Sequence, residues 1–277
     1  MPELPEVETI RRQIAPDVTR RIIVSVFVTR DRAVRAHPTP TDFITHLTGR
    51  TLTAVNRRGK ALLFPLDTDE SLLVRLGMSG QLVLVDADAP LKNHTHVRLE
   101  LDSGKSLRFI DPRTFGQMAV VNGHDPAQMP ELAHYGPEPL DDSFTADILQ
   151  EILAGRKQKI QTVLMNQELI VGIGKIYADE ACYLARIHPE RAAGSLTSIE
   201  VNLLHAAIRD VLTRAISNRG TSIKDAAYRD ARGTLGGFQQ QLNVYQREGK
   251  ECRECGTIIE HRPIQGRRMH FCPKCQN

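Results

Sequence analysis

The sequence predicts an α+β protein with several domains: an antiparallel β-sandwich or barrel, a helical domain and a small C-terminal zinc-binding segment. Short runs with β character fill residues 22–121, and amphipathic helical patterns fill residues 143–218. Two C-x-x-C pairs follow near the C-terminus. A chain of 277 residues is long enough to bury two separate cores and to carry a small appendix.

Composition favours a globular protein without a membrane span. Hydrophobic residues make up 41% of the chain and charged residues 25%, and no apolar run approaches the length of a transmembrane helix. The N-terminus lacks the pattern of a signal peptide, so we expect a cytosolic protein.

Net charge says little about a partner, because it is only +3. Basic residues gather in three clusters, at residues 57–60, 156–159 and 262–268. One such cluster is typical of a solvated face, whereas three that converge in space would bind the phosphates of a nucleic acid.

The first nine residues hold the most reactive candidate group of the chain. Removal of Met1 would leave Pro2 with a terminal secondary amine beside the carboxylates of Glu3 and Glu6. Such an amine can attack an electrophilic sugar carbon and form an iminium. The alternative is that these residues merely start a helix, since Pro and Glu are both common in a first turn.

The first predicted domain spans residues 1–121. Residues 5–14 predict an amphipathic helix, because Val7, Ile10 and Ile14 share one face. The predicted strands are residues 22–28, 51–55, 61–66, 71–76, 81–85, 96–101 and 106–110. Turn-forming residues between them favour antiparallel hairpins.

Residues 122–142 are rich in Pro, Gly and Asp and predict a linker. A helical domain follows at residues 143–244, with Ser143 or Thr145 as a helix cap. Its predicted helices are residues 143–154, 160–166, 175–185 and 197–218. Residues 219–241 contain four glycines and few apolar residues, which predicts a long functional loop.

Cysteine spacing is the strongest local signal and marks a last domain at residues 245–277. Its four thiolates would fill a tetrahedral zinc shell and leave no position for water, so the metal would be structural: Cys252, Cys255, Cys272 and Cys275. Disulfides or a redox pair are the alternatives, and the absence of a secretion signal favours zinc. Cys182 stands apart in an apolar helical pattern and is predicted to be buried.

Several blocks resemble the bacterial formamidopyrimidine-DNA glycosylases, enzymes that remove oxidised purines such as 8-oxoguanine from DNA. They are the first nine residues, residues 57–60, 76–82, 111–116, 172–180 and 238–245, and the four-cysteine segment. These blocks keep the family's order over essentially the whole chain. The resemblance implies an N-terminal antiparallel β-sandwich, a helix–two-turns–helix domain and a zinc finger, with damaged double-stranded DNA as the partner.

The resemblance also implies a mechanism. Pro2 would attack C1′ of a nucleotide turned out of the duplex, and Glu3, supported by Glu6, would act as general acid. The resulting iminium would permit β-elimination and then δ-elimination of the two flanking phosphates. Lys60 and Arg267 match residues that hold these phosphates and assist elimination.

Further positions match the family's DNA contacts. His94, Arg113 and Lys157 fall on the family's DNA-contact positions. Three residues match those that would fill the hole left by the flipped base: Met78, Arg113 and Phe115. Two more DNA-contact candidates come from the block of residues 172–180: Lys175 and Tyr177. Residues 219–241 match the loop that would close over the flipped purine.

Six residues depart from the family's usual pattern. Lys175 replaces a usual Asn beside the lesion phosphate, Arg75 a usual His, and Gln161 a usual Lys. The others are Thr95, Met269 and His270. These changes put the lesion preference in question more than the reaction class.

Two other functions fit parts of the sequence. One is an endonuclease VIII-like glycosylase for oxidised pyrimidines, against which the complete wedge set argues. The other is a zinc-finger protein that binds damaged DNA without catalysis. For the enzyme we expect one structural Zn²⁺, no catalytic cofactor, a monomer, and a location in the bacterial cytoplasm on the nucleoid.

Overall fold

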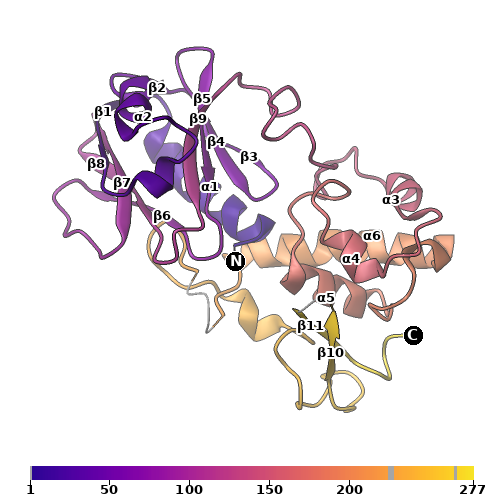
Figure 1. The fold of residues 1–277 in the computed structure, drawn as a ribbon. Coiled ribbons are helices and arrows are strands. Elements are labelled where there is room, and N and C mark those ends of the chain that lie inside the picture. The colour runs from indigo at the N-terminus through magenta and orange to yellow at the C-terminus, as the bar shows by residue number, and fades with distance from the viewer. Residues whose placement is uncertain (1, 224–227, 265–266) are drawn as a thin grey trace. The chain divides into compact units, whose positions relative to one another are not determined.

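The structure is a computed structural model that describes residues 2–223, 228–264 and 267–277 (Figure 1). The chain divides into two compact units, which are described separately. The first comprises Met1–His134 and Asn218–Gly237, and the second comprises Tyr135–Ser217 and Phe238–Asn277. Within the described residues, no helix combines the length and the apolar character that crossing a membrane requires.

The first unit begins with helix α1 (Leu4–Val18), which lies beside strands β3 (Asn56–Arg58) and β4 (Ala61–Pro65) (Figure 1). Glu3 is its N-cap, and Pro5 stands in its first turn, where a missing backbone N–H removes no helical bond. The helix runs four residues beyond the predicted end. Its apolar face is fully buried, which fixes the N-terminus of the chain against the core.

Two antiparallel sheets form the predicted β-sandwich, with the apolar core between them. The five-stranded sheet has the order β2-β1-β7-β8-β6: β1 (Arg21–Val28), β2 (Thr51–Leu52), β6 (Gln81–Asp86), β7 (Thr95–Leu101) and β8 (Lys105–Ile110). The four-stranded sheet has the order β3-β4-β5-β9, completed by β5 (Glu70–Arg75) and β9 (Gln117–Asn122). The prediction missed two strands. β3 has only three residues, and β9 directly follows the turn at residues 111–116.

The prediction also missed helix α2 (Pro40–Leu47) and the 3₁₀ turn η1 (Asp31–Val34). The signal for α2 was present: Thr39 caps it by accepting from the Asp42 backbone N–H at 3.1 Å, and Pro40 is its first residue. Eight residues are too few for the periodicity to stand out in a sequence.

Two tight turns of the sandwich meet through glycines. A Cβ added to Gly77, whose φ is 63°, would lie 2.6 Å from the backbone nitrogen of Gly116. A Cβ added to Gly80 would lie 2.2 Å from the carbonyl oxygen of Leu76. The turn at residues 76–80 therefore packs backbone to backbone on the turn at residues 111–116.

The second unit is helical and ends in a small hairpin. Thr145 caps α3 by accepting from the Ile148 backbone N–H at 3.3 Å. The helices are α3 (Ala146–Leu153), α4 (Ile160–Leu164), α5 (Lys175–Leu184) and α6 (Ser198–Ser217), with 3₁₀ turns η2 (Ala193–Ser195) and η3 (Phe238–Gln241). The hairpin pairs β10 (Glu260–Ile264) with β11 (Arg267–Phe271).

Two segments lie elsewhere than the sequence analysis placed them. The first part of the predicted linker packs on the first unit: Met129 and Leu132 are buried, and Arg75 donates to the Glu131 carbonyl at 2.6 Å. Residues 218–237 of the predicted loop also belong to the first unit, although their chain neighbours on both sides are helical-domain residues. Contacts between residues far apart in sequence decide both placements, so local patterns do not reveal them.

The glycine contact can be tested by stability. Gly77→Ala should lower the free energy of unfolding by about 3 kcal/mol, because its Cβ meets backbone atoms that cannot rotate away. Gly104→Ala is the matched control: its φ of 76° is also positive but open space surrounds it, so it should cost about 1 kcal/mol. Urea unfolding measures both, and equal losses would refute the close approach.

Candidate active site

The N-terminus of α1 is built around two buried carboxylates. Pro2 is buried, and Glu3 and Glu6 are 3% and 1% exposed. The Glu3 backbone N–H donates to Oε2 of Glu6 at 2.8 Å, and the Thr221 backbone N–H donates to Oε1 at 2.7 Å. Glu6 therefore holds the backbone next to Pro2 and ties it to residues 218–237 of the same unit. Met1 lies outside the described residues.

One turn further along α1, Glu8 gathers three arginines. Its carboxylate accepts from Arg11 at 2.8 and 2.9 Å, from Arg12 at 2.7 Å and from Arg57 at 3.1 Å. Arg57 also donates to the carbonyl of Gly59 at 3.1 Å. Gly59 and Lys60 are the two turn residues between β3 and β4, so Glu8 fixes the hairpin that carries Lys60.

Electrostatics at Glu8 favour the ionised form. Burial alone would raise the pKa of this carboxyl, but hydrogen bonds from Arg11 and Arg12 and the charge of Arg57 outweigh it. The net result is a pKa of about 2. A permanently charged Glu8 keeps the base of the Lys60 hairpin in place at every physiological pH.

Asp111 connects the turns at residues 76–80 and 111–116. This fully buried carboxylate accepts from the Ser79 hydroxyl at 2.6 Å and from the Gly116 backbone N–H at 2.7 Å. Its own backbone N–H donates to the His94 carbonyl at 3.0 Å. The Asp111 side chain thereby fixes the two turns that carry the predicted wedge residues, and its backbone N–H fixes the loop that carries His94.

The wedge residues are exposed in the structure. Met78 is 39% exposed and Phe115 is 48% exposed, while the Arg113 guanidinium lies 5.2 Å from the centre of the Phe115 ring. His94 is also exposed and has a φ of 64°. Large apolar side chains held outward by a rigid turn are available to a partner. Neither Met78 nor Phe115 is therefore a core residue.

In the second unit, the predicted phosphate contacts lie in two turns. Lys157 is exposed in the turn between α3 and α4. Lys175 is the first residue of α5, where Gly174 is the N-cap, and its Nζ lies 4.8 Å from the centre of the Tyr245 ring. The first turn of a helix offers backbone N–H groups to an anion.

Tyr177 was predicted to contact DNA, and this residue is fully buried. Its ring lies 6.1 Å from that of Phe238, centre to centre. The buried ring packs inside the second unit, and the DNA-contact role of Tyr177 stays a prediction.

The acids of α5 hold the C-terminal segment. Burial raises the pKa of Glu180, and the backbone N–H groups of Asn243, Val244 and Tyr245 oppose that effect by donating to its carboxylate at 2.9–3.0 Å. Burial likewise raises the pKa of Asp179, which accepts from the His270 backbone N–H at 3.1 Å. Glu180 therefore fixes the chain just before the first cysteine pair, and Asp179 fixes it between the two pairs.

The four cysteines form a geometry that suits zinc. Their Sγ atoms all lie within 4.8 Å of one another, with 3.9 Å between Cys252 and Cys275 and 3.5 Å between Cys255 and Cys272. No disulfide joins them. Zn–S bonds of about 2.3 Å in a tetrahedron require such spacings. These residues would hold one structural Zn²⁺, and Cys182 is buried elsewhere as predicted.

Neighbouring groups support the thiolates. The Tyr183 hydroxyl lies 3.3 Å from Sγ of Cys252. Hydrogen bonds from Thr257 lower the pKa of Cys255 to about 6. Metal ligands depend on such outer contacts for their orientation.

Arg267 lies in β11, opposite Ile264, but its side chain falls outside the described part of the structure. The predicted site also lacked Glu8 and Asp111. Both residues lie in blocks that the sequence analysis quoted. Their partners, however, are distant in sequence: Arg57 is 49 residues from Glu8, and Ser79 is 32 residues from Asp111, so local spacing does not indicate either contact.

Loss of the Glu8 charge should destabilise the protein in a pH-dependent manner. Glu8→Gln should lower the free energy of unfolding at pH 7 by about 2–3 kcal/mol. Because the folded pKa is below that of the unfolded chain, this difference is full above about pH 4.5 and vanishes as pH falls toward about 2. Urea unfolding across pH tests it, with exposed Glu151→Gln as control. A difference independent of pH would contradict the assignment.

The metal site makes a second prediction. Tyr183→Phe removes the hydroxyl beside Cys252 and should weaken zinc binding by about tenfold, as measured by competition with a chromophoric chelator. Cys275→Ser should remove one ligand and lose tight zinc binding. Unchanged affinity in the serine variant would exclude a four-thiolate site.

Two family models match this chain, and each lies wholly or mainly in one of the two compact units. The family model of the formamidopyrimidine-DNA glycosylase N-terminal domain matches residues 1–118, and that of the formamidopyrimidine-DNA glycosylase H2TH domain matches residues 135–227. A formamidopyrimidine-DNA glycosylase from Symbiobacterium thermophilum is 45% identical over 276 residues, which cover 100% of this chain and 89% of the relative.

Solved structures show the same similarity. The Thermus thermophilus MutM (Fpg) protein has a TM-score of 0.88 at 38% identity, covering 99% of this chain and 98% of that one. The Lactococcus lactis Fpg protein, in complex with DNA that contains N7-benzyl-Fapy-dG, has a TM-score of 0.90 at 35% identity and full coverage of both chains. With its fold, its N-terminal block and its cysteine cluster all matched, the chain belongs to the formamidopyrimidine-DNA glycosylase family.

Proposed function

We propose that this protein excises oxidised purines from duplex DNA and then cleaves the strand at the abasic site, with Pro2 as nucleophile. The observation that carries the proposal is the N-terminus of α1, where Pro2 and Glu3 are fixed in the same unit as an exposed, rigid wedge. Family membership supports the reaction class. The substrate would be chromosomal DNA in the bacterial cytoplasm.

The first step joins the enzyme to the sugar. The nitrogen of Pro2 attacks C1′ of the extruded nucleotide, and the bond from C1′ to the damaged base breaks. A proton from Glu3 passes to the sugar ring oxygen or to the departing base. The Pro2 nitrogen loses its proton and the bond from C1′ to the ring oxygen breaks, so that the nitrogen lone pair completes an iminium and the opened sugar keeps a hydroxyl at C4′. Glu6 supports this step because it holds the Glu3 backbone N–H at 2.8 Å.

The second step breaks the strand. The iminium at C1′ acidifies the C2′ hydrogen, so the 3′ phosphate leaves by β-elimination, and the 5′ phosphate leaves by δ-elimination. Lys60, on its hairpin fixed through Arg57 and Glu8, would hold a phosphate as a compact cation. Arg267 would bind phosphate through its guanidinium fork.

Extrusion of a nucleotide requires that the gap be filled. Met78 and Phe115 would enter the base stack, and Arg113 would hydrogen-bond the orphaned base. The Asp111 contacts support this role, because a wedge must not yield when it separates stacked bases. His94, Lys157 and Lys175 would bind phosphates. The last is a cation where the family usually has Asn.

Borohydride trapping tests the nucleophile. The wild-type protein should form a covalent adduct with a duplex that contains 8-oxoguanine, because reduction fixes the iminium. Pro2→Gly should trap more slowly. Glu3→Gln should lose base excision by at least about 100-fold yet still bind the duplex, since only the proton donor is removed.

Two outcomes would refute the proposal. One is the absence of any adduct from the wild-type protein, which favours a binding protein without catalysis. The other is full activity in a mature protein that mass spectrometry shows to retain Met1. Faster excision of thymine glycol than of 8-oxoguanine opposite cytosine would shift the substrate class to pyrimidines.

A further inference from the structure

Residues 218–223 and 228–237 are the two stems of a loop, and both contact helix α1. The first stem, residues 218–223, meets α1 where the Thr221 backbone N–H donates to Glu6. The second stem, residues 228–237, meets α1 at Gln13. Residues 6 and 13 are seven apart, which places them on the same face of a helix. One helix face therefore holds both stems of the loop.

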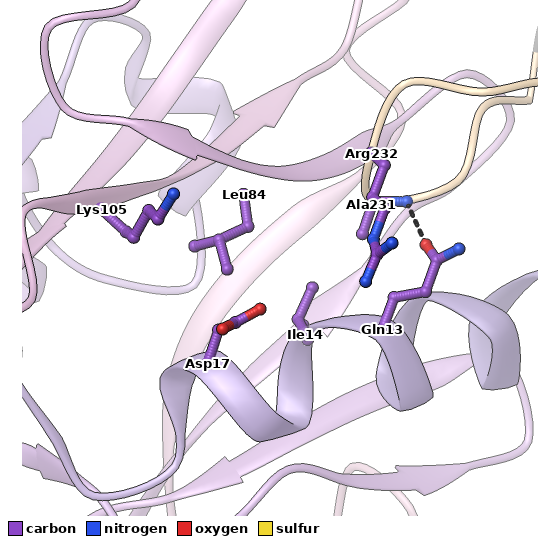
Figure 2. Close-up of a pocket in the computed structure, with 7 residues that line it drawn as sticks. All are labelled: Gln13, Ile14, Asp17, Leu84, Lys105, Ala231 and Arg232. Atoms are coloured by element: carbon purple, nitrogen blue, oxygen red, sulfur yellow. Dashed lines mark hydrogen bonds between the residues drawn. The ribbon is translucent and has the colours of Figure 1, made fainter.

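Gln13 contacts the second stem with both ends of its amide. Its Nε2 donates to Oδ2 of Asp230 at 2.9 Å, and its Oε1 accepts from the Ala231 backbone N–H at 2.9 Å, the bond drawn in Figure 2. Oδ1 of Asp230 accepts from the backbone N–H groups of Arg232 and Thr234 at 3.0 and 2.8 Å. The buried Asp230 thus shapes the turn while Gln13 docks it.

The second stem also docks on a sheet edge. The Leu84 backbone N–H of β6, the last strand of its sheet, donates to the Ala231 carbonyl at 3.1 Å. Beneath Ala231 and Arg232 lies a cavity of about 230 Å³, with Gln13, Ile14 and Asp17 along its α1 side (Figure 2). Tyr228 and Ala231 of this stem are buried in the core of the unit, and the two Gln13 hydrogen bonds fix the turn at Asp230 on α1.

The two stems touch each other. A Cβ added to Gly236 would lie 2.2 Å from the carbonyl oxygen of Gly220, and the Gly236 backbone N–H donates to the Ser222 hydroxyl at 2.9 Å. A displacement of the second stem would therefore shift the first stem. The first stem donates a hydrogen bond to Glu6, and Glu6 in turn accepts from the Glu3 backbone N–H.

We infer that Gln13 is a positioning residue that sets base excision through Asp230 and the loop stems, while leaving elimination at an abasic site largely unaffected. The inference rests on the proposed function. Glu3 delivers its proton as the base is released, so stems that contact Glu6 affect the position of the proton donor for that step. An abasic site has no base to release, although it needs the same Pro2 amine.

Gln13→Glu is the sharpest test, because it keeps the shape of the side chain and the acceptor for Ala231. It replaces the Nε2 donor by a carboxylate oxygen facing Asp230, and two like charges at hydrogen-bond distance repel. Single-turnover excision of 8-oxoguanine opposite cytosine should slow by about tenfold, as for loss of one hydrogen bond to a charged group. Incision of a preformed abasic duplex should change by less than about twofold.

A second substitution should restore the contact. In Gln13→Glu with Asp230→Asn, Nδ2 of residue 230 can donate to residue 13, while Oδ1 still accepts from Arg232 and Thr234. We expect excision to return to within about threefold of wild type, whereas Asp230→Asn alone stays slow. Asp17→Asn, on the same cavity wall, is the matched control and should leave both reactions unchanged.

Three results would overturn the inference: equal losses in excision and abasic incision, no loss in either, or a double variant as slow as Gln13→Glu. Thermal unfolding of each variant shows whether an equal loss reflects a damaged fold, which would make Gln13 merely structural. Failure of the wild-type protein to excise or to trap would instead refute the proposed function, and the inference with it.

Discussion

Burial of acidic side chains at the start of α1 is the constraint on which the candidate site depends. Taking a carboxylate out of water is unfavourable unless hydrogen bonds or opposite charges replace the lost solvation. The Glu6 carboxylate accepts hydrogen bonds from the backbone N–H groups of Glu3 and Thr221, and the Glu8 carboxylate forms ion pairs with three arginines. Apart from Arg11 and Arg12, which lie in α1 itself, the partners belong to three other segments: the N-terminus, the stem of residues 218–223 and the hairpin that carries Lys60.

The same principle organises the other functional elements. Asp111 is fully buried and is satisfied by Ser79 and Gly116, so two exposed turns behave as one rigid body. In the second unit, Glu180 accepts from the backbone just before the first cysteine pair, and Asp179 accepts from the His270 backbone between the two pairs. Buried acids therefore specify where loops sit, and apolar packing supplies the elements that carry them.

The sequence predicted groups that act through local spacing and missed those that act through distant contacts. The cysteine pairs, the N-terminal block and most strands depend on neighbours in the chain, and the structure has them where expected. The partners of Gln13 are 217 and 218 residues away, and the exposure of Phe115 depends on a turn that packs on Gly77. No periodicity encodes such contacts, because the tertiary fold alone brings the partners together.

Two departures from the family pattern lie around the same buried acid. Gln161 stands where the family usually has Lys, and its amide hydrogen-bonds Asp179 without supplying a charge. Lys175 stands where the family usually has Asn, one helical turn before Asp179, and its charge opposes the burial effect by lowering the pKa of that carboxyl. Lys175 therefore partly offsets the burial of Asp179 through its charge, whereas Gln161 offsets it through a hydrogen bond alone.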